Sequence, residues 1–570
     1  MTTKTQENAA IGFYEGKSAK NNLLSYLEEH RRQFPDRTAL QWVGDEEMDA
    51  WDKEFESDLE HQSITYRQLH ERICRTAGGL RKLGIEKGDR VVIFLPMSVP
   101  LYQSMLAVLQ NGAIAVFLES WARRNHLATS IGDLSPKAMI SVGRAFAFCK
   151  EIPEFADIPH RISVFDDESD EASTSLFSLQ QSEPRSDAEP VSGDETALIT
   201  FTTGSSGKPK GANRTHRFLS GQHRALDSCI PYGAEDIDLP AFPVFSLNNL
   251  ASGVNTVIPA VDIGSPTDDD PLILATQLRS QKTTCTTLSP SMLRGVADFC
   301  AKKGVKLDGL RRVVTGGAPI TNEDLRAFRK IAPQAAIQVL YGSTEVEPIA
   351  HIEADELLDP EHAPAAHDYG VNVGHFSEDL KSKFIRIHQK TIELSDGSWE
   401  GWEVDEGEVG EIVVAGPHVC KSYYNNPKAT RETKIRDGDQ EIWHRTGDLG
   451  YQDRFGRVWL VGRVHNAIRR DDKWIFPVQA EIALKRVSST NRVAFLGMPD
   501  EELGEKTYAA VSLVEDAEPQ AAIDEIHAVL ADENIAVDEV VVMDDIPMDP
   551  RHHSKVQYDQ LRDQIAKIER

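Results

Sequence analysis

The sequence predicts an α/β protein in which a large N-terminal domain of several subdomains precedes a small C-terminal α/β domain. Three observations support this fold class. The chain has 570 residues, more than one hydrophobic core usually organises. Near the N-terminus, amphipathic helices alternate with short apolar strands, a pattern typical of parallel sheets. Beyond about residue 464 a shorter series of helices and strands begins. We therefore expect domains at 1–463 and 464–570.

The first alternation lies between residues 65 and 118. Thr65 can cap a helix whose apolar residues recur at i, i+3 and i+4. Gly and Asp then interrupt the pattern, and an apolar strand follows at 91–95. A second helix over about 101–110 leads to a strand at 114–118. This order predicts a parallel sheet covered by helices.

An acidic, Ser-rich connection follows at about 165–195, and we expect it to be solvated and partly ordered. It leads into the strand 197–201, which delivers the segment TTGSSGKPKG at 202–211. Glycines let backbone N–H groups turn toward an anion, hydroxyls add donors, and lysines add charge. The segment therefore suits a polyphosphate, although Gly/Ser loops are also common as plain surface turns.

This loop does not have the Walker spacing, because only two residues separate Gly204 from Gly207 and Pro209 follows Lys208. Proline at that point disfavours a continuing helix. We therefore expect no helix N-terminus immediately behind the loop.

Three later segments have the composition of a binding site. The aromatic and apolar stretch 242–258 is either ordinary core or the wall of an organic-substrate pocket. The strand ending in Gly-Gly-Ala-Pro at 313–319 allows a flat molecule to approach the backbone. The strand 337–340 leads into YGSTE at 341–345, where the tyrosine can stack a base and the carboxylate can hold a metal.

The rest of the chain contains shorter elements. A turn and strand are expected at 406–416, and a hairpin around 453–457 separates WHRTGDLGY from the strand 458–463. The small C-terminal unit is expected to contain two helices and two strands: helices at 478–485 and 519–530, and strands at 493–496 and 540–542.

Composition excludes several classes of protein. The formal charge of −28 argues against a nucleic-acid-binding face and requires local donors and a cation for any anionic ligand. Six cysteines without a CxxC pair argue against zinc or a disulfide framework and fit reduced thiols. No signal peptide and no stretch of roughly 20 apolar residues is present, so we expect a cytoplasmic protein without a membrane span.

Four motifs occur in one order: FTTGSSGKPKG, YGSTE, HRTGDLGYQDRFGRVWLVGR, and a late lysine in PMDPRHHSKV. Together they resemble the adenylate-forming superfamily of acyl-CoA synthetases, adenylation domains and luciferases. The resemblance extends from Pro35 to Lys555. It implies an enzyme that uses ATP and Mg²⁺ to join a small-molecule carboxylic acid to AMP.

The resemblance also implies residue roles. The loop over the phosphates would consist of Thr202, Thr203, Gly204, Ser205, Ser206, Gly207 and Lys210. Adenine would lie against Gly316, Gly317, Ala318 and Pro319, with Tyr341 stacked on it.

The catalytic residues implied by the resemblance are Thr344 at the phosphates, Glu345 as the Mg²⁺ ligand, and Lys555 at the α-phosphate and the substrate carboxylate. Asp448 would accept hydrogen bonds from the ribose, with Arg463 nearby. Read without this context, Asp448 is a turn residue and Lys555 a solvated tail lysine. The resemblance further suggests that the small domain rotates about a hinge near residues 464–465, which brings Lys555 to the site.

The acid itself is expected to be neutral apart from its carboxylate. No acidic residue lies between Phe242 and Val261, so an ammonium group on the substrate would stay unpaired. A fatty or similar organic acid fits better, with Phe245, Asn249 and Gly317 expected in its pocket.

The second reaction step stays open at the level of sequence. CoA ligases of the superfamily usually follow the hinge with a pattern like GRxDxxIKxxGxxI, whereas this chain reads GRVHNAIRRDDKWI, with His465, Arg469 and 471–473 departing from it. The chain looks closer to bacterial β-lactone synthetases of olefin biosynthesis, in which the substrate's own β-hydroxyl displaces AMP. Lactone formation, CoA ligation and transfer to another acceptor all stay open.

The sequence also bears on a function without turnover and on partner proteins. A nucleotide-binding scaffold without turnover is disfavoured because Glu345 and Lys555 are both present. Partner enzymes of the same pathway are compatible with the resemblance. The candidates for activating a substrate hydroxyl are histidines for which a structural role is the more ordinary explanation: His216, His444, His465 and His552.

Overall fold

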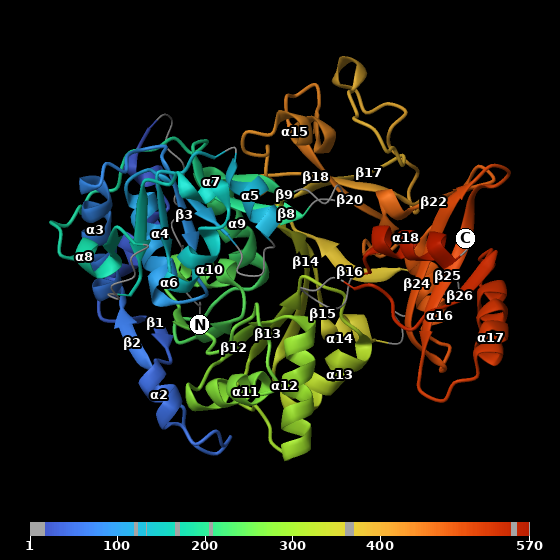
Figure 1. Ribbon diagram of the computed structural model, residues 1–570, viewed down its shortest axis with the longest axis horizontal. Coiled ribbons are helices and arrows are strands. Elements are labelled where there is room, and N and C mark those ends of the chain that lie inside the picture. Colours follow the sequence, from blue (N-terminus) through green and yellow to red (C-terminus); the bar gives the residue numbers. More distant parts are fainter. Residues whose placement is uncertain are drawn as a thin grey trace, which may run out of the picture.

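The computed structural model describes residues 17–118, 124–132, 134–165, 172–203, 209–359, 370–548 and 556–568. It confirms the mixed α/β class (Figure 1). Two large sheets with their helices form the N-terminal part, and a smaller unit, drawn in red, lies at one end of the molecule (Figure 1).

The first large sheet contains the predicted parallel strands and the phosphate-loop hairpin. Its order is β7-β6-β5-β3-β4-β8-β9, and all neighbours are parallel except β8 and β9. Its strands are β3 (Arg90–Phe94), β4 (Ile114–Phe117), β5 (Ala138–Ser141), β6 (His160–Ser163), β7 (Thr174–Ser175), β8 (Thr196–Thr203) and β9 (Pro209–Thr215).

The two helices predicted from the sequence pack against this sheet in one buried cluster, whereas the short helix at 45–50 contacts Gln62, outside this sheet. The Thr65 hydroxyl caps α3 by accepting the backbone N–H of Gln68, as expected for Thr65, and the Gln68 side chain accepts the Thr65 N–H in return. Part of the acidic connection is ordered, because Leu176 and Leu179 of α8 are buried. The helices are α1 (Leu24–Gln33), α2 (Asp45–Ala50), α3 (Tyr66–Lys82), α4 (Val99–Gln110), α5 (Arg124–Gly132), α6 (Gly143–Cys149), α7 (Pro153–Ala156) and α8 (Leu176–Gln180).

The second sheet has fourteen strands in the order β17-β18-β20-β21-β16-β15-β14-β13-β12-β10-β11-β1-β2, with β19 beside β20. The segment from β1 to β14 along this path is parallel, and the strands from β15 to β17 are antiparallel.

The strands of the second sheet are β1 (Thr38–Trp42), β2 (Gln62–Thr65), β10 (Ile237–Pro240), β11 (Asn255–Val257), β12 (Cys285–Leu288), β13 (Arg312–Gly316), β14 (Ala336–Ser343), β15 (Val346–Glu353), β16 (Val371–Phe376), β17 (Lys381–Ile385), β18 (Gly410–Ala415), β19 (Lys434–Arg436), β20 (Ile442–Gln452) and β21 (Val458–Arg463).

One buried cluster joins the two sheets, since it contains Ile93 of β3, Leu40 of β1 and Leu250 of α10. The pairing of the two sheets through this core brings the strand ends of both to a common region. The helices of this part are α9 (His216–Cys229), α10 (Pro243–Ser252), α11 (Asp270–Ser280), α12 (Pro290–Lys303), α13 (Asn322–Ile331), α14 (Ala354–Leu358) and α15 (Pro427–Thr433).

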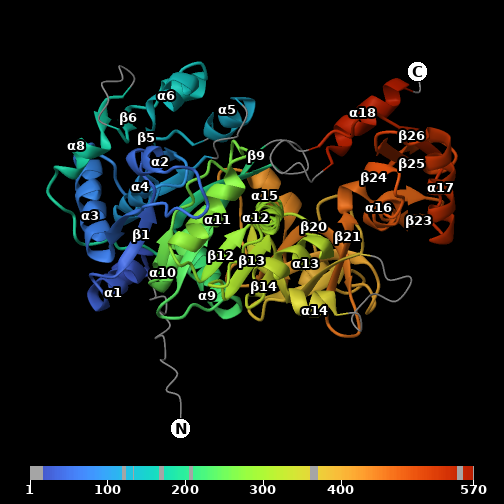
Figure 2. The same cartoon turned by 90° about the horizontal axis from the view of Figure 1, so that it is seen from below.

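The small unit begins after β21, where the short turn Val464–Asn466 leads into a hairpin and a three-stranded sheet (Figure 2). Trp474 and Phe476 pack against the cluster that contains Tyr451 and Trp459 of the large unit. The elements are β22 (Ile468–Arg470), β23 (Lys473–Ile475), β24 (Thr490–Asp500), β25 (Gly504–Leu513), β26 (Glu539–Val542), α16 (Pro477–Leu484), α17 (Pro519–Asp532) and α18 (Tyr558–Ile568).

Among the described helices, none has the length and apolar character needed to cross a bilayer.

Candidate active site

The phosphate-loop segment connects two antiparallel strands. Thr202 of β8 stands opposite Lys210 of β9 in the register. The chain returns from the loop as a strand, as the proline in the loop predicted. The described residues do not include 204–208 and 549–555, so Gly204, Ser205, Ser206, Gly207, His552 and Lys555, together with the side chain of Thr203, lie outside them.

Glu345 follows β14 directly and is largely buried, with 9% of its surface exposed. The Tyr423 hydroxyl donates to its Oε1 at 2.6 Å, and the Thr202 hydroxyl donates to the same oxygen at 3.3 Å. Neither of these side chains donates a hydrogen bond to Oε2. The carboxylate therefore joins the first sheet to the second through Thr202.

Tyr423 reaches Glu345 because its segment is held by backbone bonds on both sides. The Cys420 N–H donates to the Glu345 carbonyl at 2.8 Å, and the Tyr424 N–H donates to the Gly211 carbonyl at 2.8 Å. These bonds clamp the segment between the YGSTE motif and the phosphate-loop hairpin.

Two basic side chains lie behind Tyr423. Lys434 and His444 are register partners on β19 and β20, and the Lys434 ammonium lies 3.0 Å from His444 Nδ1. The Lys434 nitrogen is 5.4 Å from the centroid of the Tyr423 ring, and the Lys210 nitrogen is 5.8 Å from it. We call Glu345, Tyr423, Lys434 and His444 the interior cluster.

The electrostatics of the interior cluster favour an ionised carboxylate. Burial alone raises the pKa of Glu345, but the interactions with His444, Tyr423 and Lys434 outweigh it and hold the pKa below its usual range. Burial, and then the charge of Lys434, lowers the pKa of His444 to about 3, so its ring is neutral near pH 7. A buried carboxylate with one oxygen free of side-chain partners is a donor that fits a hard divalent cation.

A second cluster joins β14, β20 and β21, which are interior strands of the same sheet. The Tyr341 hydroxyl donates to Asp448 Oδ2 at 2.5 Å, and Arg463 Nη1 donates to Asp448 Oδ1 at 2.8 Å. Asp448 and Arg463 are register partners on β20 and β21. Burial, and then the charge of Asp448, raises the pKa of Tyr341 well above its usual range. We call these three residues the rim cluster.

The Gly-Gly turn lies beside the rim cluster, because Gly316 of β13 pairs with Leu340 of β14. A Cβ on Gly316 would come within 2.3 Å of the Leu340 carbonyl oxygen, so no larger residue fits there. Gly317 has φ near +78° and is exposed, while Ala318 and Pro319 continue the turn. The arrangement leaves an accessible backbone edge next to Tyr341.

Thr344 is tied to the phosphate-loop hairpin by a residue that sequence reasoning did not select. Arg214 of β9 is buried, and its Nη2 donates to the Thr344 carbonyl at 2.7 Å. No spacing in the sequence marks Arg214, Tyr423 or Lys434 as neighbours of YGSTE, because each lies on a different strand or loop.

The residues expected in the acid pocket are found in two places. Phe245 of α10 is buried with Val314 and Leu340, next to the strand ends that lead to the rim cluster. Asn249, one turn later, donates to Asp238 Oδ2 at 2.9 Å and is fully buried. Gly317 belongs to the turn described above.

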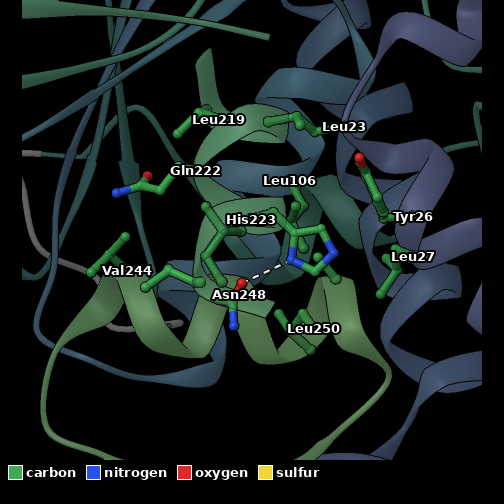
Figure 3. A pocket seen from close by; sticks show the side chains of 13 residues that line it. Leu23, Tyr26, Leu27, Leu106, Leu219, Gln222, His223, Val244, Asn248 and Leu250 are labelled. Atoms are coloured by element: carbon green, nitrogen blue, oxygen red, sulfur yellow. Dashed lines mark hydrogen bonds between the residues drawn. The ribbon is translucent and has the colours of Figure 1, made fainter. Parts of the chain in front are cut away.

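An apolar cavity lies on another face of α10, between α1, α4 and α9 (Figure 3). His223 Nδ1 donates to Asn248 Oδ1 at 2.8 Å and provides its main polar contact (Figure 3). Most of the lining is aliphatic: Leu23, Leu27, Leu106, Leu219, Leu226, Val244, Leu247, Leu250 and Ala251.

Two of the described candidate histidines, His216 and His444, are buried, whereas His465 is exposed. Burial lowers the pKa of His216 to about 4, and partial desolvation lowers the pKa of His465. His444 belongs to the interior cluster. None of the three forms a described hydrogen bond with a residue of the rim cluster.

Comparison with known proteins is consistent with this geometry. A family model described as AMP-binding enzyme matches residues 27–424. An olefin beta-lactone synthetase of Stenotrophomonas maltophilia is 30% identical over 551 residues, which cover 94% of this chain and 96% of that protein.

Two solved structures are similar over nearly the whole chain. An amide bond synthetase from Marinactinospora thermotolerans superposes with a TM-score of 0.76 at 21% identity, covering 95% of this chain and 99% of that one. The o-succinylbenzoate coenzyme A synthetase of Bacillus subtilis, in complex with ATP and magnesium ion, gives 0.73 at 20%, with 94% and 99% covered. At these identities the similarity shows the fold, with a large N-terminal and a smaller C-terminal domain.

Proposed function

This chain belongs to the AMP-binding enzyme family and is an AMP-forming ligase, and on that premise we propose that it activates a fatty or β-hydroxy fatty acid as its acyl-adenylate. The observation that carries the proposal is that Glu345, which accepts a hydrogen bond from Thr202 of the phosphate-loop hairpin, lies four residues along the chain from Tyr341 of the rim cluster. A carboxylate oxygen of the acid attacks the α-phosphorus of ATP, and the bond to pyrophosphate breaks.

The rim cluster would bind the nucleoside. Asp448 has the two acceptor oxygens that ribose hydroxyls require, and Arg463 and Tyr341 fix their direction. Adenine would lie on the backbone edge at 316–319. Thr202, Lys210 and the loop between them would surround the phosphates, with Thr344 next to them.

Glu345 would hold Mg²⁺ through the oxygen that Tyr423 and Thr202 leave open. Bound there, the ion would offset the negative charge that grows between the acid and the phosphates. Little covalent work falls to the side chains, so positioning and electrostatics supply the acceleration. Lys555 would add a second cation from the small domain.

We assign the large and small domains to residues 1–463 and 464–570, with rotation about the turn Val464–Asn466. A short junction of this kind is enough to absorb a change in φ and ψ. The six cysteines without a CxxC pair fit reduced thiols and support a cytoplasmic location for the enzyme.

The acyl chain would occupy the apolar cavity beside α10. The segment 242–261 contains no acidic residue, and the cavity has an aliphatic lining. Both observations support a long, uncharged acyl chain. Leu247→Trp, which fills the cavity, should shift the preference toward shorter acids by about tenfold in kcat/KM, within the range of hydrophobic pocket discrimination. An unchanged chain-length profile would place the chain elsewhere.

For the second step we propose attack by the substrate's β-hydroxyl oxygen on the acyl carbon. A β-lactone forms, the bond to AMP breaks, and the hydroxyl proton is released. Similarity to the olefin beta-lactone synthetase of Stenotrophomonas maltophilia supports this outcome. The turn between β22 and β23 also departs from the pattern usual in CoA ligases, because Asp471 and Asp472 stand where that pattern has a glycine turn and adopt left-handed φ values of 47° and 63°.

Pyrophosphate exchange with a panel of long-chain acids tests the first step, with AMP rather than ADP as the expected product. Exchange with no acid despite ATP binding would instead indicate a scaffold. Mass spectrometry of products with and without CoA tests the second step. A thioester that appears only with CoA would overturn lactone formation, and a product that needs an added partner enzyme would identify another acceptor.

A further inference from the structure

A lysine inside the second sheet has no part in the reaction derived so far. Lys434 is only 9% exposed, and its ammonium contacts the neutral His444 ring. Among the described residues, no carboxylate forms an ion pair with it. Burying an ammonium without a paired anion costs free energy, because its hydration is lost. This cost indicates that the positive charge of Lys434 acts on a neighbouring group.

The nearest anion that can respond to this charge is Glu345. The electrostatic partners of Lys434 are Cys420 and Glu345, and the Tyr423 ring stands between the lysine and the carboxylate. Cys420 is buried, and its thiol donates to the Ser422 carbonyl at 3.1 Å and to the Asn213 carbonyl at 3.5 Å, so these carbonyls are its hydrogen-bond partners. Glu345 is the remaining partner.

A continuous series of contacts connects the Lys434 ammonium to the Glu345 carboxylate. His444 Nδ1 accepts from the Lys434 ammonium, the ammonium lies 5.4 Å from the Tyr423 ring centroid, and the Tyr423 hydroxyl donates to Glu345 Oε1. A cation over an aromatic ring is attracted to its face, and burial strengthens that attraction. The lysine thus restrains the ring whose hydroxyl holds one oxygen of the carboxylate.

We propose that Lys434 and His444 are positioning residues for Glu345, acting through Tyr423 so that Oε2 stays aimed at the divalent cation. This inference rests on the proposed function only in taking Glu345 as the Mg²⁺ ligand. The pair touches neither the acid nor the nucleotide, and His444 serves by holding the ammonium in place.

A purely structural lysine would behave differently. Methionine has nearly the length of lysine and no charge, and replacing buried charges by apolar residues of similar volume is often neutral or stabilising. Lys434→Met therefore keeps the packing and removes the cation. Lys383→Met is a matched control, because Lys383 of the same sheet also lies 5.4 Å from aromatic rings, those of Trp399 and Trp443.

The experiment measures Mg²⁺ binding without turnover. At a fixed concentration of a non-hydrolysable ATP analogue, the unfolding temperature is followed as Mg²⁺ is added, and the midpoint concentration is read. We expect Lys434→Met and Tyr423→Phe each to raise this midpoint about tenfold. The double variant should do no more than either single one, and Lys383→Met should match the wild type. In exchange assays the KM for Mg²⁺ should rise about tenfold while kcat at saturating Mg²⁺ stays within about twofold.

The outcomes separate the two proposals. A lower unfolding temperature for Lys434→Met without Mg²⁺, together with an unchanged midpoint, would make Lys434 purely structural and overturn the inference. Multiplicative effects in the double variant would overturn the route through Tyr423. A failure of the proposed function would show in the wild type, as exchange with no acid, while the midpoints of the variants still decide the role of Lys434.

Discussion

The interior and rim clusters contain the same pair of groups in opposite surroundings. In each, a tyrosine hydroxyl donates to a carboxylate, at 2.6 Å to Glu345 and at 2.5 Å to Asp448. In the rim cluster the cation touches the carboxylate, and the Arg463 side chain is 48% exposed. In the interior cluster the cation lies behind the tyrosine and is buried.

The difference indicates what each cluster can do. Arg463 of the rim ion pair is 48% exposed and Asp448 is 15% exposed. Water and salt therefore screen the guanidinium more than an interior charge, and the rim cluster is suited to direct contact with a ligand. An interior charge acts in a lower effective dielectric and reaches a carboxylate that it does not touch. The first arrangement presents donors and acceptors, whereas the second sets the state of a single carboxylate.

The largest expected effect separates the two carboxylates by kinetics. Glu345→Gln should lower kcat for pyrophosphate exchange by about 10²–10³, because an electrostatic contribution at the reacting phosphates is lost. Asp448→Asn should mainly raise the KM for ATP, because ribose contacts persist through the reaction. Steady-state kinetics with varied ATP measure both. Equal losses of kcat in the two variants would contradict the different roles assigned to Glu345 and Asp448.

The tyrosines should differ in stability. Tyr423→Phe leaves a buried carboxylate without its shorter hydrogen bond and should cost about 1–3 kcal/mol of unfolding free energy. Tyr341→Phe should cost less, since Asp448 keeps Arg463 as a partner. Urea denaturation of the two variants beside the wild type gives the two values. A larger loss for Tyr341→Phe would reverse the order argued here.

Acid should destabilise the interior cluster through His444. Burial holds the pKa of His444 at about 3, against an ordinary value of 6.5. Between these values the unfolded chain binds more protons, so stability is full above about pH 6.5 and falls as the pH is lowered. The loss from this group is about 1 kcal/mol over the first pH unit. His444→Leu should flatten the decline measured by thermal unfolding at pH 6.5 and 5.5. An Arg463→Gln control should keep the wild-type slope, because arginine does not titrate there.

The smallest effect is expected for the exposed cation. Arg463→Met should change the unfolding free energy by only about 0–1 kcal/mol, and the difference should shrink further in high salt. Denaturation at low and high ionic strength measures it. A loss above this range that persists in salt would show that Arg463 is part of the core rather than of the rim.

Much of the fold and part of the site followed from the sequence. The helices at 66–82 and 99–110 and the strands between them follow from periodicities that extend over a few residues. The strand β25 and the helices α11 to α13 lie outside the predicted segments, although the capping box of Thr321 and Asp324 is a local signal for the start of α13. In the site, Glu345 and Asp448 stand in short motifs, so their types and order could be read directly.

The surroundings of these carboxylates could not be predicted in this way. Tyr423 lies 78 residues beyond Glu345, and no local spacing links the two. They meet because the segment before α15 is clamped between Gly211 and Glu345.

The family, the α/β class and the identity of the reactive carboxylates could be predicted from the sequence, because motifs and periodicities are local. The buried lysine and histidine behind one of those carboxylates, and the exposed arginine beside the other, were found only in the folded chain. The physical reason is that strand order and register, rather than distance along the chain, determine which charges share a region of low dielectric.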